Sequence, residues 1–291
     1  MAPKIQWPLV LFSLFAGVGG CAFAFAGVAN ALGEMSGVTN AVTVAAFVLV
    51  CVGGLCSVIH LATPKNAWAV VTHILSFSGI SVELIMLGIT CVFMAAFVLC
   101  DFVAFPSIVK TACGLIGALS GVYLAFATGH GYLISSKPTW NTTKLPIAYT
   151  STSLIGGALF YLSVSSMLGA SASVTSLLIV VALLCGFFNV VALMAYMGHL
   201  GPEIARTNKK LYGYGIVFCG IMMNLITTAA LYVLTLCSPE LGALFTAVSF
   251  VGLAFSLIGG LALRMLMWIV GAGFLSLFDL AREHRSVILN Q

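Results

Sequence analysis

The sequence predicts an all-α integral membrane protein with eight transmembrane helices, and three observations carry this prediction. Of the 291 residues, 62% are hydrophobic and only 6% are charged, whereas soluble domains average about 25% charged residues. So few charges cannot coat a water-facing surface of this size, and we expect lipid to cover most of it. No span alternates with the period of two that membrane β-barrels show. Helices satisfy every backbone polar group within one segment, as lipid demands.

Apolar windows of about 20 residues, long enough to cross about 30 Å of hydrocarbon, fall at eight places along the chain. They are 7–32, 40–61, 75–100, 105–128, 146–169, 174–198, 213–236 and 241–277. The interruption at 169–173 is the most weakly marked, while 201–210 is a long polar link. The first window follows Lys4 and imitates a secretory signal, but we expect it to be the first transmembrane helix of a single membrane domain over 1–291.

Basic residues predict the orientation of the helices. One face collects the N-terminus, the links after the second, fourth and sixth windows, and the C-terminal tail. Its nine basic residues are Lys4, Lys65, Lys137, Lys144, Arg206, Lys209, Lys210, Arg282 and Arg285. The other face holds Lys110 alone, and Arg264 lies within the last window. The positive-inside rule therefore predicts that both termini are cytoplasmic, and the basic links are also candidate docking surfaces for an acidic partner.

One carboxylate stands out because it lies inside a span. Glu83 falls about two turns into the third window, where an ionisable group costs about 2.5–3.5 kcal/mol to insert. His60 ends the second window near the same face, and Arg264 approaches it from the last window. The ionisable groups thus gather at one end, which favours a shallow site near one interface over the midplane site of a transporter.

Short motifs around these residues resemble one family. His60-Leu61-Ala62-Thr63-Pro64, then Ala67-Trp68 and Glu83 in the next helix, is similar to the membrane-anchor subunit of dimethyl sulfoxide reductase. Gln6-Trp7-Pro8-Leu9 resembles the start of that family, and Pro138-Thr139-Trp140 resembles its Pro-Thr-Trp before the fifth helix.

The resemblance implies a concrete function in the cytoplasmic (inner) membrane of a prokaryote. Such subunits bind and oxidise menaquinol in anaerobic respiration and pass electrons to a ferredoxin-like iron–sulfur subunit, which feeds a molybdopterin catalytic subunit. They carry no haem or iron–sulfur cluster themselves. The resemblance also implies two four-helix bundles, with the quinol site in residues 1–130 and the rest in 131–291.

The site residues follow from the same resemblance. The histidine and glutamate of the family's quinol site correspond to His60 and Glu83. Asn66, beside Lys65, stands where the family has an arginine two residues after its proline. We expect Lys65, Asn66, Trp68 and Arg264 to complete the menaquinol pocket. The charge count departs from the family's best-known members, whose termini both lie outside.

The chemistry of quinol oxidation fits these residue types. Two protons must leave, and a histidine that titrates near neutrality beside a glutamate in apolar surroundings can accept and relay them. Two electrons also need an acceptor. The nine cysteines have no Cys-x-x-Cys spacing typical of iron–sulfur sites, so the acceptor is expected on a partner. No feature indicates nucleic acid as a partner, and membrane lipid surrounds the spans.

Other interpretations remain open. Glu83 can be a structural carboxylate, His60 a helix C-terminal cation, and Arg264 a snorkelling or structurally paired side chain. The tryptophans Trp7, Trp68, Trp140 and Trp268 suit interface anchors, and Asn189 and Asn224 suit interhelical hydrogen bonds. At the level of function, the alternatives are a haem-b or quinone-reducing membrane subunit of another respiratory complex and a transporter without a redox partner.

Overall fold

A computed structural model describes residues 5–59, 78–135, 137, 139–207, 210–237 and 242–271. Its helices are α1 (Trp7–Ala31), α2 (Ser36–Ile59), α4 (Gly79–Phe102), α5 (Ser107–His130), α6 (Lys144–Ser166), α7 (Ala172–Thr207), α8 (Lys210–Gly215), the π-helix η3 (Ile216–Met223), α9 (Asn224–Cys237) and α10 (Ala243–Val270).

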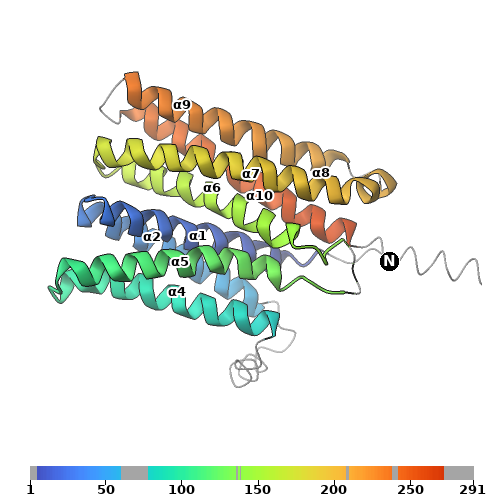
Figure 1. The fold of residues 1–291 in the computed structure, drawn as a ribbon, viewed down its shortest axis with the longest axis horizontal. Helices are drawn as coiled ribbons and strands as arrows, with labels where there is room; N and C mark the ends of the chain where they lie inside the picture. The colour runs from blue at the N-terminus through green and yellow to red at the C-terminus, as the bar shows by residue number, and fades with distance from the viewer. Residues whose placement is uncertain are drawn as a thin grey trace, which may run out of the picture.

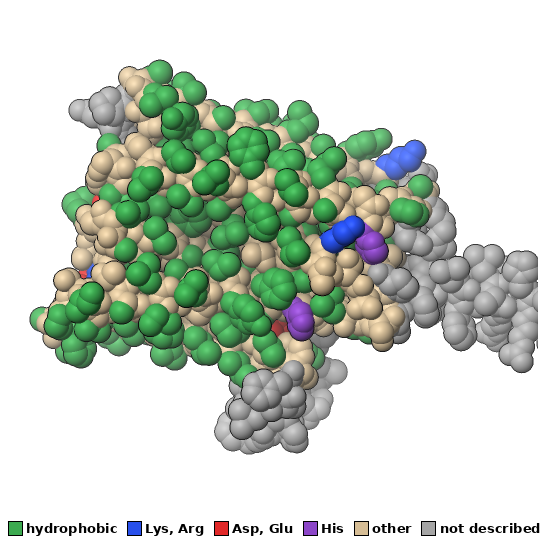
Figure 2. Space-filling view, in the orientation of Figure 1, with side chains coloured by type: hydrophobic (Ala, Val, Ile, Leu, Met, Phe, Trp, Pro, Cys, Tyr) green, Lys and Arg blue, Asp and Glu red, His purple; other side chains and the backbone are tan. Residues whose placement is uncertain are grey.

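The prediction of eight spans is confirmed. Within the described ranges, 8 helices are long and apolar enough to cross a membrane, with α8, η3 and α9 together forming the seventh. The weakly marked link after the fifth span is real, since α6 ends at Ser166 and α7 begins at Ala172, with Gly169 at a φ of +71° in the turn between them. Lipid-facing apolar side chains cover the face of the molecule drawn in Figure 2.

Helix α1 is the centre of the assembly. Of the residues in its apolar window, 83% are buried, and it packs against α2, α5 and α6. Figure 1 shows α2, α4 and α5 near α1 on one side, and α6, α7, α9 and α10 stacked on the other. The first window is therefore confirmed as a helix, whereas the assignment of functions to 1–130 and 131–291 stays a prediction.

Glycines allow α1 and α5 to pack backbone against backbone. A Cβ on Gly20 would lie 2.8 Å from the carbonyl oxygen of Gly121, and a Cβ on Gly114 would lie 3.1 Å from Cα of Gly27. Both pairs are spaced seven residues apart along their helices, so they lie on one face of each. This close contact fixes α5 against the central helix, and the C-terminal end of α5 leads into the candidate site.

Two features differ from the sequence prediction. Helix α7 continues to Thr207 with Pro202 inside it, so residues 201–207 of the predicted polar link are helical: a proline is tolerated where neighbouring groups satisfy the freed carbonyl. The seventh span contains a π-helical turn, η3, which hydropathy does not reveal because the stretch is equally apolar in either winding.

Of the two asparagines predicted to form hydrogen bonds between helices, one does so and the other does not. Asn189 does so, since its Nδ2 donates to the Gly220 carbonyl at 2.6 Å and its Oδ1 accepts from Ser151 Oγ at 3.1 Å. Asn224 does not, because its Nδ2 donates at 2.9 Å to the same Gly220 carbonyl within its own span.

Candidate functional site

The structure describes two of the six predicted site residues, Glu83 and Arg264. The other four, His60, Lys65, Asn66 and Trp68, lie outside the described residues. We call the end of the molecule formed by the start of α4 and the ends of α5 and α10 the site end. The links between α1 and α2, α4 and α5, and α6 and α7 form the opposite end (Figure 1).

Glu83 is positioned by the first turns of α4. The helix begins at Gly79, and Ser78 caps it by accepting the backbone N–H of Ser81 at 3.3 Å. Glu83 therefore lies one turn inside the helix, where it is half-buried. Among the described residues, no hydrogen bond or ion pair joins its carboxylate. It neither points fully into lipid nor lies sealed in a closed core.

The neighbour of Glu83 across the helix pair is Gly131, directly after α5. A Cβ on Gly131 would lie 3.8 Å from Glu83 Oε2, and a Cβ on Gly79 would lie 3.0 Å from Cα of Gly131. The start of α4 and the end of α5 thus nearly touch. This contact places the carboxylate beside the link from α5 to α6.

That link carries an aromatic cluster of Tyr132, Trp140, Tyr149 and Trp268. The Tyr132 ring lies edge-on to the other three, with centroids 5.7 Å from Trp140, 6.2 Å from Tyr149 and 5.9 Å from Trp268. Trp140 and Trp268 are 5.1 Å apart. Edge-to-face pairs at these separations add to the stabilisation from burial. The cluster holds the link against α6 and the end of α10.

Polar contacts complete the aromatic cluster. Trp140 Nε1 donates to the carbonyl of Met267 at 2.9 Å, while Trp268 Nε1 is buried without a partner in the described part of the chain. Lys137 Nζ lies 3.6 Å from the Trp140 ring centroid, and burial lowers the pKa of this lysine. Burial raises the pKa of Tyr132 well above its ordinary value; Tyr149 and Glu83 raise it further, and Arg264 opposes them.

Arg264 is fully buried, which excludes the snorkelling interpretation. Its Nε donates to Ser13 Oγ at 3.0 Å and its Nη2 to the Ser13 carbonyl at 3.1 Å. Nη1 donates to the Gly260 carbonyl at 3.0 Å, and Nη2 approaches Ser153 Oγ at 3.5 Å. The guanidinium carbon lies 4.4 Å from the Tyr149 ring centroid. Neutral oxygens and a ring face, rather than a carboxylate, surround this charge among the described residues.

The tryptophans do not all behave as interface anchors. Trp7 is 47% exposed, as an anchor at the headgroup level would be. Trp140 and Trp268 are 2% and 6% exposed, so that prediction is wrong for both. The reason is that each indole packs on aromatic partners from distant parts of the chain.

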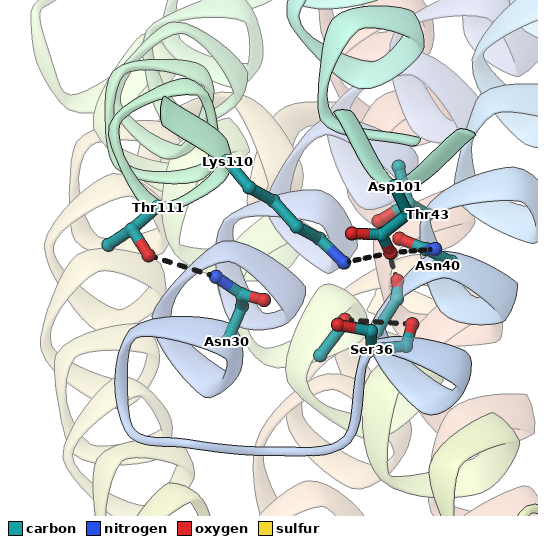
Figure 3. A network of polar contacts seen from close by, with 8 residues as sticks. Asn30, Ser36, Asn40, Thr43, Asp101, Lys110 and Thr111 are labelled. Carbon is teal, nitrogen blue, oxygen red and sulfur yellow. Dashed lines mark hydrogen bonds and ion pairs between the residues drawn. The ribbon is translucent and has the colours of Figure 1, made fainter. Parts of the chain in front are cut away.

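The opposite end holds a different polar arrangement (Figure 3). Lys110 Nζ, from α5, is paired with Asp101 Oδ2, from α4, at 2.6 Å. Asn40 Nδ2, from α2, donates to the same carboxylate oxygen at 2.6 Å. Asn30 Nδ2 donates to Thr111 Oγ1 at 3.2 Å. Three helices are therefore joined by one carboxylate.

A second carboxylate at the opposite end is also satisfied. Glu34 is buried, and its two oxygens accept the backbone N–H of Ser171 at 3.1 Å each. It also accepts the N–H of Met35 at 3.0 Å. The link between α1 and α2 is thereby tied to the link between α6 and α7.

Two lipid-side cavities lie away from Glu83. One, of about 280 Å³, is lined by α2 and α4 residues including Phe47 and Val98, and the other, of about 200 Å³, includes Leu119 and Cys185. Their linings are apolar apart from Thr43 in the first, and its hydroxyl already donates to the Thr39 carbonyl at 2.7 Å, so neither cavity suits a quinol headgroup. The nine cysteines are free thiols distributed over several helices.

Sequence reasoning missed two members of the site end, Tyr132 and Tyr149. The available signal was Gly131-Tyr132 directly after the fourth window, where a glycine and a phenol follow a histidine at a helix end. Tyr149 had no such signal, since a tyrosine in the first turns of a span is ordinary.

Comparison with known proteins adds one finding. The family model for the DMSO reductase anchor subunit (DmsC) matches residues 1–259. A comparison with curated proteins found no match.

Proposed function

The chain belongs to the DMSO reductase anchor subunit (DmsC) family, and on that premise we propose that it oxidises menaquinol in the membrane and passes the electrons to an iron–sulfur subunit. As a family member it is the multi-pass membrane anchor of an oxidoreductase complex that includes catalytic and iron–sulfur subunits. The menaquinol chemistry, the direction of electron flow and the residues involved are the parts we propose.

The observation that carries the proposal is the state of Glu83. A carboxylate in a membrane span is retained at a cost and marks a functional site by default. Here it is half-buried, and no described residue pairs with it. By contrast, the two carboxylates at the opposite end both have partners. An available hydrogen-bond acceptor at the lipid boundary is what a quinol hydroxyl requires.

The proposed chemistry divides the work between this chain and its partners. Glu83 accepts a hydrogen bond and then a proton from one quinol hydroxyl, and His60 accepts the proton of the other, so that two protons leave with the two electrons. Lys65, Asn66 and Trp68 line the headgroup pocket. The two electrons leave to the iron–sulfur subunit, which we place against the site end because tunnelling requires short separation. Arg264, held by α1 and α6, stabilises the walls of this end.

The orientation is part of the same proposal. Lys137 lies in the link after α5, and Lys144 and Lys210 begin α6 and α8, all at the end where Glu83 lies. Lys110 lies at the other end. By the positive-inside rule the site end and both termini are cytoplasmic. A phosphatase reporter fused to the C-terminus should then be inactive, and an active fusion would reverse the orientation.

The test of function is a pair of isosteric carboxylate variants in the assembled complex. We expect Glu83→Gln to lower menaquinol-analogue oxidation about 100-fold or more, the contribution of a positioned proton acceptor. Asp101→Asn, at the opposite end, is the matched control and should retain wild-type turnover. A reduced viologen, which delivers electrons to the partner subunits directly, should support equal activity in all three proteins.

Three outcomes would overturn the proposal. Wild-type quinol oxidation by Glu83→Gln would remove the carboxylate from the mechanism. Purification of the chain without iron–sulfur or molybdenum-containing companions would favour a transporter. A Soret band from the purified chain would instead indicate a haem-b subunit.

A further inference from the structure

We propose that the hydroxyl of Tyr132 is the second hydrogen-bonding group of the quinol site and holds the headgroup against Glu83. This inference rests on the proposed function and adds to it a substrate-binding residue that the motifs around His60 do not contain. The class of ligand it fits is a para-quinol, whose two oxygens lie at opposite edges of one ring.

The position of Tyr132 follows from its neighbour in the chain. Gly131, directly before it, lies beside the Glu83 carboxylate, since a Cβ built on this glycine would be 3.8 Å from Oε2. Because Gly131 has no side chain, nothing of its own fills the space beside the carboxylate. Tyr132 is the next residue of the link, and its phenol lies near enough to the Glu83 carboxylate for that charge to raise the pKa of the phenol.

The ring of Tyr132 is fixed, whereas its hydroxyl is available. Three edge-on contacts, to Trp140, Tyr149 and Trp268, hold the ring from several sides. The hydroxyl forms no hydrogen bond with any described residue and is not among the buried unpaired oxygens of the described chain. A half-buried phenol held in this way is preorganised to donate to a ligand at little entropic cost.

The chemistry of the donor suits the reaction. Burial raises the pKa of Tyr132, and Tyr149 and Glu83 add to the effect, so the phenol stays protonated and donates throughout the physiological range. During oxidation each quinol C–O–H becomes a C=O, which is a hydrogen-bond acceptor without a proton to donate. A fixed donor at that oxygen therefore binds the product-like state more strongly than the starting quinol, which favours turnover.

The experiment removes the hydroxyl and keeps the ring. In the assembled complex, Tyr132→Phe should lower kcat/KM for a menaquinol analogue about tenfold, the effect of one hydrogen bond in a desolvated site. The affinity for a hydroxyquinoline N-oxide, a quinol-site inhibitor, should weaken by a similar factor. The matched control is Tyr123→Phe in α5, the helix that precedes Tyr132, because that tyrosine is 48% exposed within a span; it should match wild type.

A purely structural role would show a different result. Tyr132→Phe retains all three ring contacts, so viologen-dependent activity and thermal unfolding of the complex should be unchanged. A loss of both, in parallel with quinol oxidation, would overturn the inference. If the variant fails to assemble, 3,5-difluorotyrosine at this position preserves the shape and strengthens the donor; inhibitor affinity should then change about twofold or more, and an unchanged affinity would overturn the inference.

The inference and the proposed function can fail separately. Wild-type kcat/KM in Tyr132→Phe, combined with a large loss in Glu83→Gln, would discard Tyr132 and leave quinol oxidation at Glu83 intact. Wild-type turnover in both variants would discard the site altogether.

Discussion

The two ends of this membrane protein handle buried charge in opposite ways. At the opposite end, Asp101 pairs with Lys110 at 2.6 Å and accepts from Asn40, and Glu34 accepts backbone N–H groups from two links. At the site end, the buried Arg264 binds neutral oxygens and the face of Tyr149. The carboxylate of that end, Glu83, has no partner among the described residues.

The difference indicates what each end is for. An ion pair fixes two helices, but neither of its charged groups is then free to bind a ligand. Removing one partner leaves the other charge uncompensated. Holding a cation with neutral groups costs more in desolvation, but it requires no carboxylate as a counter-ion. The contacts of the opposite end therefore join helices to one another, whereas the unpaired carboxylate of the site end is what the proposed quinol site requires.

The strongest way to break this comparison is to change how Arg264 is held. Arg264→Lys keeps the buried charge but loses the planar fork that reaches both oxygens of Ser13 and the ring of Tyr149. We expect it to lower the free energy of unfolding by about 3 kcal/mol, measured by equilibrium unfolding in mixed detergent, with an earlier midpoint than that of the wild type.

Arg264→Met is the informative companion, because it removes the desolvation cost together with the hydrogen bonds. It should lose less stability than Arg264→Lys. If Arg264→Lys instead unfolds at the wild-type midpoint, the guanidinium fork is not what secures the site end.

A smaller effect should follow at the opposite end. Asp101→Asn removes the anion that faces the buried ammonium of Lys110, and we expect a loss of about 1–2 kcal/mol, since Asp101 is partly exposed and water screens part of the pair. Adding Lys110→Met should recover part of that loss in the same unfolding assay. Equal stability of the single and double variants would contradict a coupled pair.

The smallest effect concerns the aromatic cluster. Trp140→Phe keeps a ring but deletes the hydrogen bond from Nε1 to the Met267 carbonyl, which should cost about 1 kcal/mol. Trp7→Phe, at an exposed indole, should stay within about 0.5 kcal/mol of wild type. Equal losses in the two variants would mean that both indoles act as interface anchors after all.

Much of the fold could be predicted because lipid imposes strong local rules. Length and hydropathy alone place the eight spans, and a rise of about 1.5 Å per residue was enough to place Glu83 near one end. The weak link around Gly169 was also found correctly, since small polar residues there interrupt an apolar run.

The site could be predicted only in part, because its walls come from distant segments. Trp140 and Met267 meet across 127 positions, and no local pattern reveals that contact, which is why two buried indoles were assigned to the interface. The neutral cage around Arg264 joins Ser13, Ser153 and Gly260 from three helices for the same reason. His60 and its neighbours to Trp68 stay predictions, as does the menaquinol pocket they would form.

The π-helical turn in the seventh span has a consequence for how that span tolerates change in length. Between Ile216 and Met223 the chain is wound more widely than in α8 or α9, and the Gly220 carbonyl accepts two asparagine amides there. Excising one residue would let the segment rewind as an ordinary α-helix, but everything on one side would rotate by about 100° around the axis. The π-helical turn therefore sets the rotation of α8 relative to α9 about the axis of the span, and with it which side chains each half presents to neighbouring helices.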